Sequence, residues 1–579
     1  MNWEKKYAEW IHFEQLSKNL KQELDTINDK KELEERFYRY LEFGTGGMRG
    51  ELGVGINRIN SYTVRRVTLG LAEYLLKTDK DAASKGVVVS YDSRHFSKEF
   101  AEETAFVLAD KGIKVFLSDE LRPTPLLSFL VREFGAAAGV MITASHNPSN
   151  YNGYKIYGED GGQITQDTAN YISKLLNEID NELFIPSGEL ESFIKSGKVV
   201  IFSKEVEQLY LTQVTSVIKN PSIIEKSAMD FKIVYSPLHG TGLKLVESAL
   251  RDNGFKNLQI VKEQAIPDGN FPTVYSPNPE EKSSFLLAME LGAKEKANIL
   301  MATDPDADRL GVAVLNEQGS YQILNGNQLG VLLLNYLLLN SNDEQLKNAA
   351  IIKTIVTSDL GTILAEEYGV KVFNTLTGFK YIGEKITQFE KQESYQFIFG
   401  YEESFGYLIR PFVRDKDAVQ AALLTAEVGV HYNEQGKTLL DALDEIYKKY
   451  GYYLEALETM IFNGAKAEAE MLKSIEKWRE TPPQLINGIK VVQIDDYLTQ
   501  ESKDLVKKQK VDIKLPKSNV LKFYLIDGSW ICIRPSGTEQ KCKLYFSVHE
   551  DNENEAQEKL TNLKIATMKI FDEFKQLII

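Results

Sequence analysis

Short apolar runs separated by stretches of helical periodicity dominate the chain from residue 44 onward. The runs 86–90, 115–117 and 139–143 have the length and apolar content of buried strands. Strands that alternate with helices are typical of the α/β class. The pattern therefore predicts an α/β fold.

The same texture occurs three times, with a strand leading into a helical segment at 87–90, 233–235 and 351–356. We expect three similar α/β units. The chain from residue 489 onward differs, because short strands lie close together before a final helix. Its expected strands are 490–494, 521–526, 530–533 and 544–548, and its expected helix is 554–575. This part is predicted to be a smaller α+β domain.

Turn-rich or polar stretches at 187–198, after 304–311 and at 466–483 interrupt the pattern. They predict four domains, with bounds 1–200, 201–312, 313–465 and 466–579. The first begins with an amphipathic helix, because aromatic residues recur at helical spacing from Trp3 to Phe13. The apolar run 331–339 is too short to span a bilayer and is predicted to be a buried core helix.

A length of 579 residues agrees with about four domains of ordinary size. The formal net charge of -15 gives no general attraction to nucleic acid or to an anionic membrane, so any basic site must be local. Two cysteines exclude a disulfide framework and a cysteine-rich zinc module. The N-terminus lacks a secretory signal pattern, and a cytoplasmic location is expected.

The first candidate loop is Thr-Ala-Ser-His-Asn-Pro at 143–148, directly after an apolar run. A serine at the end of a strand, among small and turn-forming residues, is accessible and can act as a nucleophile. An ordinary turn is the alternative. The cation of Lys155 on the same loop favours a chemical role for Ser145, with His146 orienting or assisting it.

The second candidate loop carries Asp304, Asp306 and Asp308, followed by Arg309. Three carboxylates at alternate positions can converge on one hard cation, and oxygen-only ligands favour Mg²⁺ over zinc. An EF-hand is excluded because Arg309 and Leu315 occupy its glycine and glutamate positions. A solvated acidic turn is the alternative, which the preceding apolar strand and the following arginine disfavour.

Two further loops carry binding chemistry. Glu402 and Ser404 lie between glycines at 400–406, where carboxylate and hydroxyl groups suit sugar hydroxyls, although a solvated loop is the default for Glu403. A phosphate cradle is predicted at the end of strand 530–533, with a tight turn as the alternative. It comprises Arg534, Ser536, Gly537 and Thr538. The glycine-rich stretches 44–50 and 240–242 match no nucleotide-binding motif.

Together these loops offer a nucleophile, a metal site, a sugar-binding loop and a phosphate cradle, which describes phosphoryl transfer on a sugar phosphate. On these motifs, which extend from residue 44 to 541, the sequence resembles the α-D-phosphohexomutase superfamily, and most closely its phosphoglucomutase and phosphopentomutase branch. The resemblance implies four domains around a central cleft, three of them mixed α/β and the last α+β. It also implies an intramolecular phosphotransferase of the isomerase class.

The resemblance implies that Ser145 is carried as a phosphoserine whose phosphate oxygen joins the three aspartates around Mg²⁺. It places Arg49 and Arg309 near the reacting phosphoryl group and Lys155 near the transferring proton. The remaining implied substrate contacts are Thr377, Gly378, Lys380, Glu402, Ser404, Lys416, Arg534, Ser536, Gly537 and Thr538. Three positions depart from the family pattern without removing a ligand: Tyr401, Ala307 and Gln540.

The reaction implied by the resemblance converts glucose 1-phosphate into glucose 6-phosphate and back, with glucose 1,6-bisphosphate as intermediate and activator. The expected partners are small-molecule sugar phosphates. Ribose 1-phosphate, deoxyribose 1-phosphate and mannose phosphates remain alternative substrates. A phosphatase with an aspartate nucleophile is disfavoured by Asp308, which stands where that class has threonine or valine. A non-catalytic sugar-phosphate binding protein is disfavoured because Ser145, the aspartates and Arg534 are all present.

Overall fold

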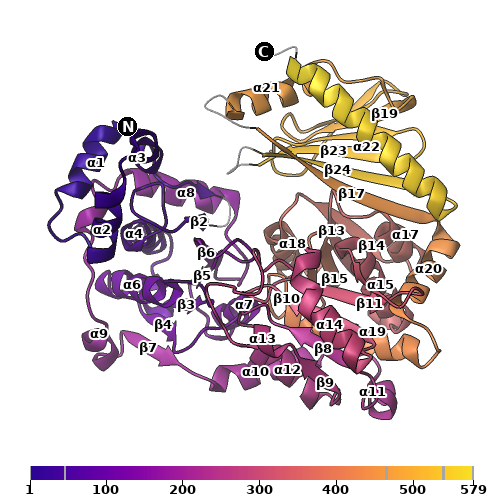
Figure 1. Cartoon of the computed structure of the whole chain (residues 1–579), viewed down its shortest axis with the longest axis horizontal. Coiled ribbons are helices and arrows are strands. Elements are labelled where there is room, and N and C mark those ends of the chain that lie inside the picture. The colour runs from indigo at the N-terminus through magenta and orange to yellow at the C-terminus, as the bar shows by residue number, and fades with distance from the viewer. Residues whose placement is uncertain (1, 45–46, 463–466, 537–540, 577–579) are drawn as a thin grey trace.

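The computed structural model describes residues 2–44, 47–462, 467–536 and 541–576, and these residues form four successive β-sheets flanked by helices (Figure 1). The sheets follow one another in chain order from the N-terminal part to the C-terminal part. The predicted fold class is confirmed: three mixed α/β units precede an α+β unit.

The first sheet has the strand order β1-β2-β6-β5-β3-β4-β7. Its strands are β1 (Phe43–Gly44), β2 (Gly47–Glu51), β3 (Val87–Tyr91), β4 (Val115–Ser118), β5 (Ala138–Ile142), β6 (Tyr151–Gly158) and β7 (Val199–Phe202). Its α-helices are α1 (Trp3–Ile11), α2 (Lys18–Thr26), α3 (Lys30–Phe37), α4 (Ser61–Thr78), α5 (Ala82–Lys85), α6 (Ser97–Asp110), α7 (Thr124–Glu133), α8 (Gln166–Asn177) and α9 (Glu191–Lys195). The predicted N-terminal helix is α1, and it buries Trp10.

The second sheet has the order β12-β11-β10-β8-β9, in which β8, β9 and β10 are parallel. Its strands are β8 (Ile233–Ser236), β9 (Leu258–Ile260), β10 (Ile299–Thr303), β11 (Leu310–Leu315) and β12 (Tyr321–Leu324). Its helices are α10 (Glu205–Thr215), α11 (Pro221–Ser227), α12 (Leu243–Asp252), α13 (Lys262–Ala265) and α14 (Leu286–Glu295).

The third sheet has the order β14-β13-β15-β16. Its strands are β13 (Ala349–Thr354), β14 (Lys371–Thr375), β15 (Gln396–Glu402) and β16 (Gly406–Leu408). Its helices are α15 (Gly326–Leu339), α16 (Asp343–Leu346), α17 (Leu360–Glu367), α18 (Phe379–Gln392), α19 (Ala418–Asn433) and α20 (Leu439–Tyr450). Helix α15 contains the apolar run predicted as a core helix, and a capping box at Asn325 begins it.

The fourth sheet is antiparallel, with the order β17-β24-β23-β22-β19-β20-β21, and β18 pairs with β19. Its strands are β17 (Tyr452–Ile461), β18 (Leu485–Ile486), β19 (Ile489–Asp496), β20 (Glu501–Asp504), β21 (Gln509–Asp512), β22 (Leu521–Leu525), β23 (Trp530–Pro535) and β24 (Lys541–Glu550). Its helices, α21 (Ala467–Glu480) and α22 (Glu553–Gln576), lie together along the sheet (Figure 1).

Sheet membership differs from the expected domain bounds at three places. Residue 200 falls inside β7, which pairs with β4 of the first sheet. Residue 312 falls inside β11, which continues through β12 in the second sheet. Strand β17, expected in the third domain, pairs along its whole length with β24 of the fourth sheet. The reason is that partners distant in sequence, and not local turns, decide which sheet a strand joins.

The first three parts share one continuous hydrophobic core, which includes Met141, Met301 and Ile351 from the three sheets. The C-terminal part has its own core around Trp478 and Phe523. A smaller cluster joins it to the third part. That cluster contains Ile355, Val356 and Leu376 on one side and Tyr497, Val520, Trp530, Cys532 and Tyr545 on the other. Three parts therefore form one body, to which the C-terminal part attaches through a limited contact.

Candidate active site

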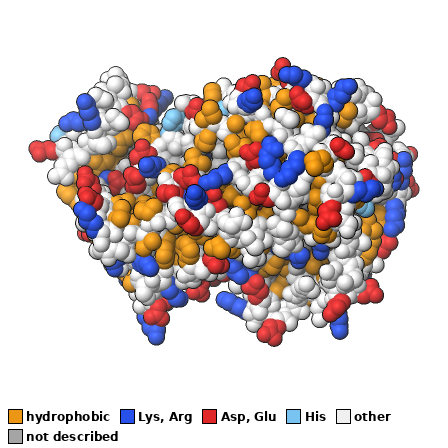
Figure 2. All heavy atoms as spheres, turned by 90° about the horizontal axis from the view of Figure 1, so that it is seen from below, with side chains coloured by type: hydrophobic (Ala, Val, Ile, Leu, Met, Phe, Trp, Pro, Cys, Tyr) orange, Lys and Arg blue, Asp and Glu red, His pale blue; other side chains and the backbone are white. Residues whose placement is uncertain are grey.

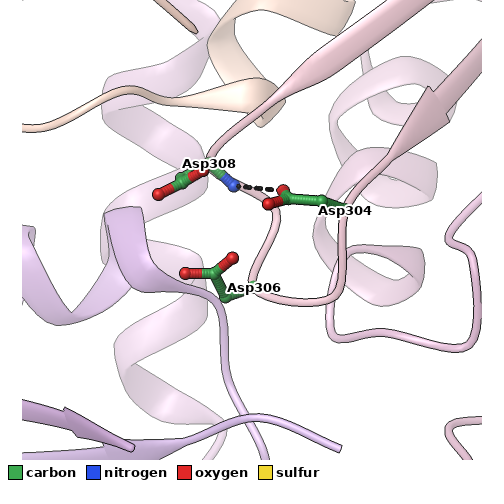
Figure 3. A group of neighbouring side chains, drawn as sticks. All are labelled: Asp304, Asp306 and Asp308. Atoms are coloured by element: carbon green, nitrogen blue, oxygen red, sulfur yellow. Dashed lines mark hydrogen bonds between the residues drawn. The ribbon is translucent and has the colours of Figure 1, made fainter. Parts of the chain in front are cut away.

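The acidic loop between β10 and β11 gathers its three carboxylates at one point (Figure 3). One carboxylate oxygen from each of Asp304, Asp306 and Asp308 lies within 4.8 Å of the others, and all three residues are buried. Asp304 Oδ1 accepts hydrogen bonds from the N–H groups of Asp308 and Arg309, both at 3.1 Å. Ala307 has a positive φ of 50°, which glycine adopts at lower cost. The backbone of this loop is therefore fixed around the carboxylates.

The unused oxygens of this cluster fit a cation. Asp306 Oδ2 accepts from Lys155 Nζ at 2.6 Å and Asp308 Oδ2 faces Lys416 Nζ at 3.1 Å. The Oδ1 atoms of Asp306 and Asp308 are buried and have no hydrogen-bond partner among the described residues. A buried carboxylate oxygen without a partner is costly, so these atoms call for a positive ligand. An all-oxygen donor set suits a hard divalent ion.

Electrostatics within the cluster separate its members. Burial, with Asp306 and Asp308 beside it, raises the pKa of Asp304 well above its usual range. Burial also opposes ionisation of Asp308, but Lys155, Lys416 and Arg309 hold its pKa well below the usual range. The three aspartates and the cations thus lie together, with Lys155 and Lys416 paired directly to Asp308.

Ser145 lies against this cluster, although 159 residues separate it from Asp304 along the chain. Its Oγ donates to Asp304 Oδ2 at 2.6 Å and lies 3.1 Å from His146 Nδ1. The residue follows β5 and has a positive φ of 52°, a conformation that turns its side chain out of the strand direction. Burial, together with Arg309 and Arg49, lowers the pKa of His146 well below its usual range, so this imidazole is neutral at pH 7.

The predicted cations occupy different positions around Ser145. Lys155 on β6 and Lys416 before α19 both reach Asp308. Arg309 forms an ion pair with Glu280. Arg49 on β2 is exposed and donates to Asn147 Oδ1 at 2.9 Å, on the serine loop itself.

The predicted sugar loop adjoins the acidic loop. Leu310 N donates to Phe405 O at 3.1 Å, and Arg309 forms a β-bridge with Gly406. Glu402 is buried, and burial raises its pKa to about 7, with Lys416 opposing the shift. Ser404 is half-buried in the turn between β15 and β16.

Glu403 turns away from its neighbour Glu402. Its Oε2 accepts from the hydroxyls of Thr354 and Thr357 at the end of β13, both at 3.2 Å. The prediction that Glu403 lies in a solvated loop is therefore wrong, because the third sheet supplies hydrogen-bond partners for its carboxylate.

The predicted phosphate-binding residues lie in the C-terminal part, across its contact with the third part. Arg534 is the last residue but one of β23, and its Nη1 lies 3.5 Å from Tyr545 Oη. Ser536 N donates to Lys541 O at 2.8 Å. Gly537 and Thr538 lie outside the described residues. Within the described ranges, Arg534 makes no hydrogen bond or ion pair to Ser145 or to the three aspartates.

Lys380 at the start of α18 faces the same region from the third part, beside Thr377 and Gly378. Burial lowers the pKa of Lys380 to about 8; Glu384 opposes this shift and Arg534 adds to it. Gly378 has a positive φ of 110°, which a residue with a side chain adopts only with strain. Two residues from different parts, Lys380 and Arg534, thus contribute positive charge to one area.

Two residues that support the site were not predicted from the sequence. Thr124, at the start of α7, donates from Oγ1 to Asp306 Oδ2 at 2.7 Å and from its N–H to Asp306 O at 2.9 Å. Arg94 donates to backbone carbonyls of the serine loop. Each residue lies in the segment that follows a predicted strand, and this position was the sequence signal that could have identified it.

The surface and the helices add two observations. Acidic and basic side chains are interspersed over the face in Figure 2. Within the described residues, the longest apolar helices fall short of what crossing a bilayer requires.

Comparison with known proteins identifies relatives over almost the whole chain. A Staphylococcus saprophyticus protein named phosphoglucomutase is 38% identical over 549 residues, covering 95% of this chain and 97% of that protein. A Staphylococcus aureus phosphoglucomutase is 41% identical over 527 residues, covering 90% and 92%. These similarities show that the chain is an enzyme of the mutase class.

Solved structures share the fold at low sequence identity. A phosphoglucomutase/phosphomannomutase family protein from Burkholderia thailandensis has a TM-score of 0.66 at 18% identity, covering 92% of this chain and 97% of that one. The phosphoglucomutase parafusin from Paramecium, in an open form, has a TM-score of 0.67 at 18% identity, covering 93% and 96%.

Family models match all four parts in order. Models of phosphoglucomutase/phosphomannomutase α/β/α domains I, II and III match residues 40–183, 208–318 and 325–450. The model of the C-terminal domain of the same family matches residues 486–561. The chain therefore belongs to the phosphoglucomutase/phosphomannomutase family.

Proposed function

We propose that this enzyme interconverts glucose 1-phosphate and glucose 6-phosphate, with Ser145 as the phosphoryl carrier and glucose 1,6-bisphosphate as the intermediate. The observation that carries the proposal is the 2.6 Å contact between Ser145 Oγ and Asp304, beside two buried carboxylate oxygens without partners in the described chain. A nucleophile held next to a cation site is what phosphoryl transfer requires.

Asp304, Asp306 and Asp308 would hold Mg²⁺, because the donor set is all oxygen and partly unsatisfied. When bound, the ion supplies positive charge to phosphoryl oxygens. Phosphoserine adds about two negative charges at neutral pH to three carboxylates. Lys155, Lys416 and Arg309 offset this charge around the same point, which supports transfer through a loose transition state.

In the forward direction, the bond between phosphorus and Ser145 Oγ breaks while a bond forms to O6 of glucose 1-phosphate; O6 loses its proton and Ser145 Oγ gains one. In the second half, the bond between O1 and its phosphorus breaks while a bond forms to Ser145 Oγ; Oγ loses its proton and O1 gains one, which leaves glucose 6-phosphate. Burial opposes the charged form of Lys155, but Asp306 and Asp308 raise its pKa, so Lys155 carries a positive charge beside these carboxylates.

The sugar and its second phosphate would bind between the third and fourth parts. Glu402, with a pKa of about 7, can accept from or donate to a sugar hydroxyl at neutral pH. Lys380 and Arg534 would hold the phosphate that does not react, together with the loop that contains Ser536, Gly537 and Thr538. Thr377, Gly378 and Ser404 would complete the sugar site. The limited contact of the C-terminal part would allow the bisphosphate to turn end for end.

We favour glucose over mannose or a pentose as the sugar of the substrate, because the Staphylococcus relatives, at 38–41% identity, carry the name phosphoglucomutase. A cytoplasmic location accompanies the proposal, since buried free thiols at Cys532 and Cys542 suit a reducing compartment.

The test compares mutase rates on the 1-phosphates of glucose, mannose, ribose and deoxyribose, with Mg²⁺ and a bisphosphate activator. We expect glucose 1-phosphate to have the highest kcat/KM. Faster turnover of a pentose phosphate would contradict the proposed substrate but would agree with the proposed phosphoryl transfer through Ser145. Peptide mass spectrometry of the phosphorylated enzyme should find phosphate on Ser145; phosphate on an aspartate with release of inorganic phosphate would instead establish a phosphatase.

A further inference from the structure

The serine loop has no regular secondary structure of its own. Between β5 and β6 the chain forms turns, and Ser145 has a positive φ of 52°. Local bonds hold the loop: Ser145 N donates to Thr143 Oγ1 at 2.8 Å, Asn147 N to Ala144 O at 3.2 Å, and Tyr151 N to Pro148 O at 3.1 Å. These local bonds do not reach the carbonyl groups of Ser145 and Asn147, which another part of the chain must therefore satisfy.

Arg94 supplies those partners. Its Nη1 donates to Pro148 O at 2.8 Å and to Tyr151 O at 3.0 Å. Its Nη2 donates to the carbonyl oxygens of Ser145 and Asn147. One guanidinium thus spans the loop from the nucleophile to the first residue of β6. Only arginine has enough donors in a rigid fork to do this; lysine has three donors at a single point.

The guanidinium is itself fixed in place. The Arg94 side chain is fully buried, and its Nε lies 3.4 Å from Asp92 Oδ2. Asp92 Oδ1 accepts from Arg94 N at 2.9 Å and from Ser97 Oγ at 2.7 Å. The ring of Phe271, from the second part of the chain, lies 4.9 Å from the guanidinium carbon. Arg94 is therefore held from both the first and the second part.

The second part touches the serine loop again nearby. Ser276 Oγ donates to His146 O at 2.7 Å, and Asn270 Oδ1 lies 3.0 Å from His95 Nε2. Segment 270–276 thus bears on Arg94 and on the loop that Arg94 holds. The relative position of the two parts decides whether Ser145 Oγ meets Asp304, so a brace at this junction acts on the reacting geometry.

We propose that Arg94 is a positioning residue that holds the 145–151 loop so that Ser145 Oγ faces the aspartate cluster. Arg94 donates to carbonyl groups of the loop and makes no hydrogen bond or ion pair with the three aspartates within the described residues, so it acts through Ser145. The inference rests on the proposed function of Ser145. It predicts a loss in kcat with little change in KM, because the predicted sugar and phosphate contacts lie in the third and fourth parts.

The test is Arg94→Lys, with Arg66→Lys as a matched control. Arg66 is also a buried arginine of the first part, which donates to one carbonyl, Leu176 O, at 2.7 Å and stacks on Tyr40. We expect R94K to lower kcat on glucose 1-phosphate about 50-fold with KM within about threefold, as for residues that orient reacting groups. R66K should leave both constants within about threefold of the wild type at a similar loss of melting temperature.

A second readout needs no substrate. Hydrogen exchange of the peptide that contains 145–151 should be faster in R94K than in the wild type, and unchanged in R66K. A kcat loss no larger than that of R66K, or unchanged exchange of this loop, overturns the proposal. Absence of turnover in the wild type would refute the proposed function alone, since the exchange result would still stand.

If R94K does not fold, Asp92→Asn keeps Arg94 and removes the charge that fixes Nε. We expect the same loop to exchange faster in D92N, with a kcat loss of about tenfold. For a folded Arg94→Ala, 20 mM guanidinium should recover about a tenth of the lost activity, whereas methylammonium should not. Unchanged exchange in D92N, or equal recovery by both cations, would contradict a positioning role for the fork.

Discussion

The Ser145–aspartate cluster and the Arg534 region differ in how the chain holds them. The cluster lies where the first, second and third parts share one continuous core, and its charged groups contact one another directly. Arg534 belongs to a part with a separate core, joined to the third part by a smaller apolar cluster. The proposed chemistry thus lies within three parts that share a core, whereas the proposed contact to the distal phosphate lies in a part with its own core.

Figure 1 shows the same division, with the C-terminal sheet standing apart from the three-part body except where it meets the third part. Substitutions in the two regions should therefore change different kinetic constants. Changes in the cluster should remove kcat, and changes near Arg534 should weaken binding.

The largest effect should come from Ser145→Ala. Without the carrier oxygen no phosphoenzyme forms, and we expect turnover to fall about 10⁴-fold or more. A coupled assay of glucose 6-phosphate formation measures this, and the melting temperature confirms folding. Turnover above about one per cent of wild type, with the Mg²⁺ response intact, would mean that another residue carries the phosphate.

Asp306→Asn should rank second. It removes one charge from the proposed Mg²⁺ site, and we expect kcat to fall about 100-fold. Mg²⁺ should raise the melting temperature of the wild type, because a ligand that binds the folded form stabilises it, and should not do so in D306N. The exposed Asp343→Asn on α16 is the matched control and should behave as the wild type. Equal Mg²⁺ stabilisation of all three proteins would place the ion elsewhere.

Arg534→Ala should act mainly on binding. Loss of a charge-assisted contact to the non-reacting phosphate should raise KM about 20-fold and change kcat less than about threefold. Lys507→Ala, an exposed change in the same part of the chain, should leave KM unchanged. A pure kcat loss in R534A would show that the two regions act together and would break the comparison.

The smallest effect should be a pH dependence carried by Lys380. Burial lowers its pKa to about 8, so its charge is present at pH 7 and lost as the pH rises through 8. KM should rise about fivefold between pH 7 and pH 9, while the substrate phosphate remains a dianion. Lys380→Arg should abolish this rise, since a guanidinium stays protonated. A rise that persists in K380R would assign the titration to another group.

Local pattern in the sequence was sufficient for many features. The acidic loop followed from the alternation of Asp304, Asp306 and Asp308 after an apolar strand, and the structure gathers these carboxylates within 4.8 Å. The core helix α15 and most strands followed from period and length. Such features depend on neighbours within a few residues, and so they can be read from the chain directly.

Partners distant in sequence decided the rest. Strand β17 joined the fourth sheet through β24, and β12 joined the second sheet, because pairing depends on which strands meet in space. Glu403 found Thr354 and Thr357, and Arg94 found the serine loop, through contacts that no spacing in the sequence announces.

The sequence by itself therefore determined which chemical groups are present and on which loops they lie. The tertiary structure brings Ser145 Oγ to 2.6 Å from Asp304, 159 residues away, and places Arg94 against the loop that contains Ser145. The physical reason is that the local sequence fixes which residues follow each strand, whereas the core shared by three sheets fixes the distances between the strand ends.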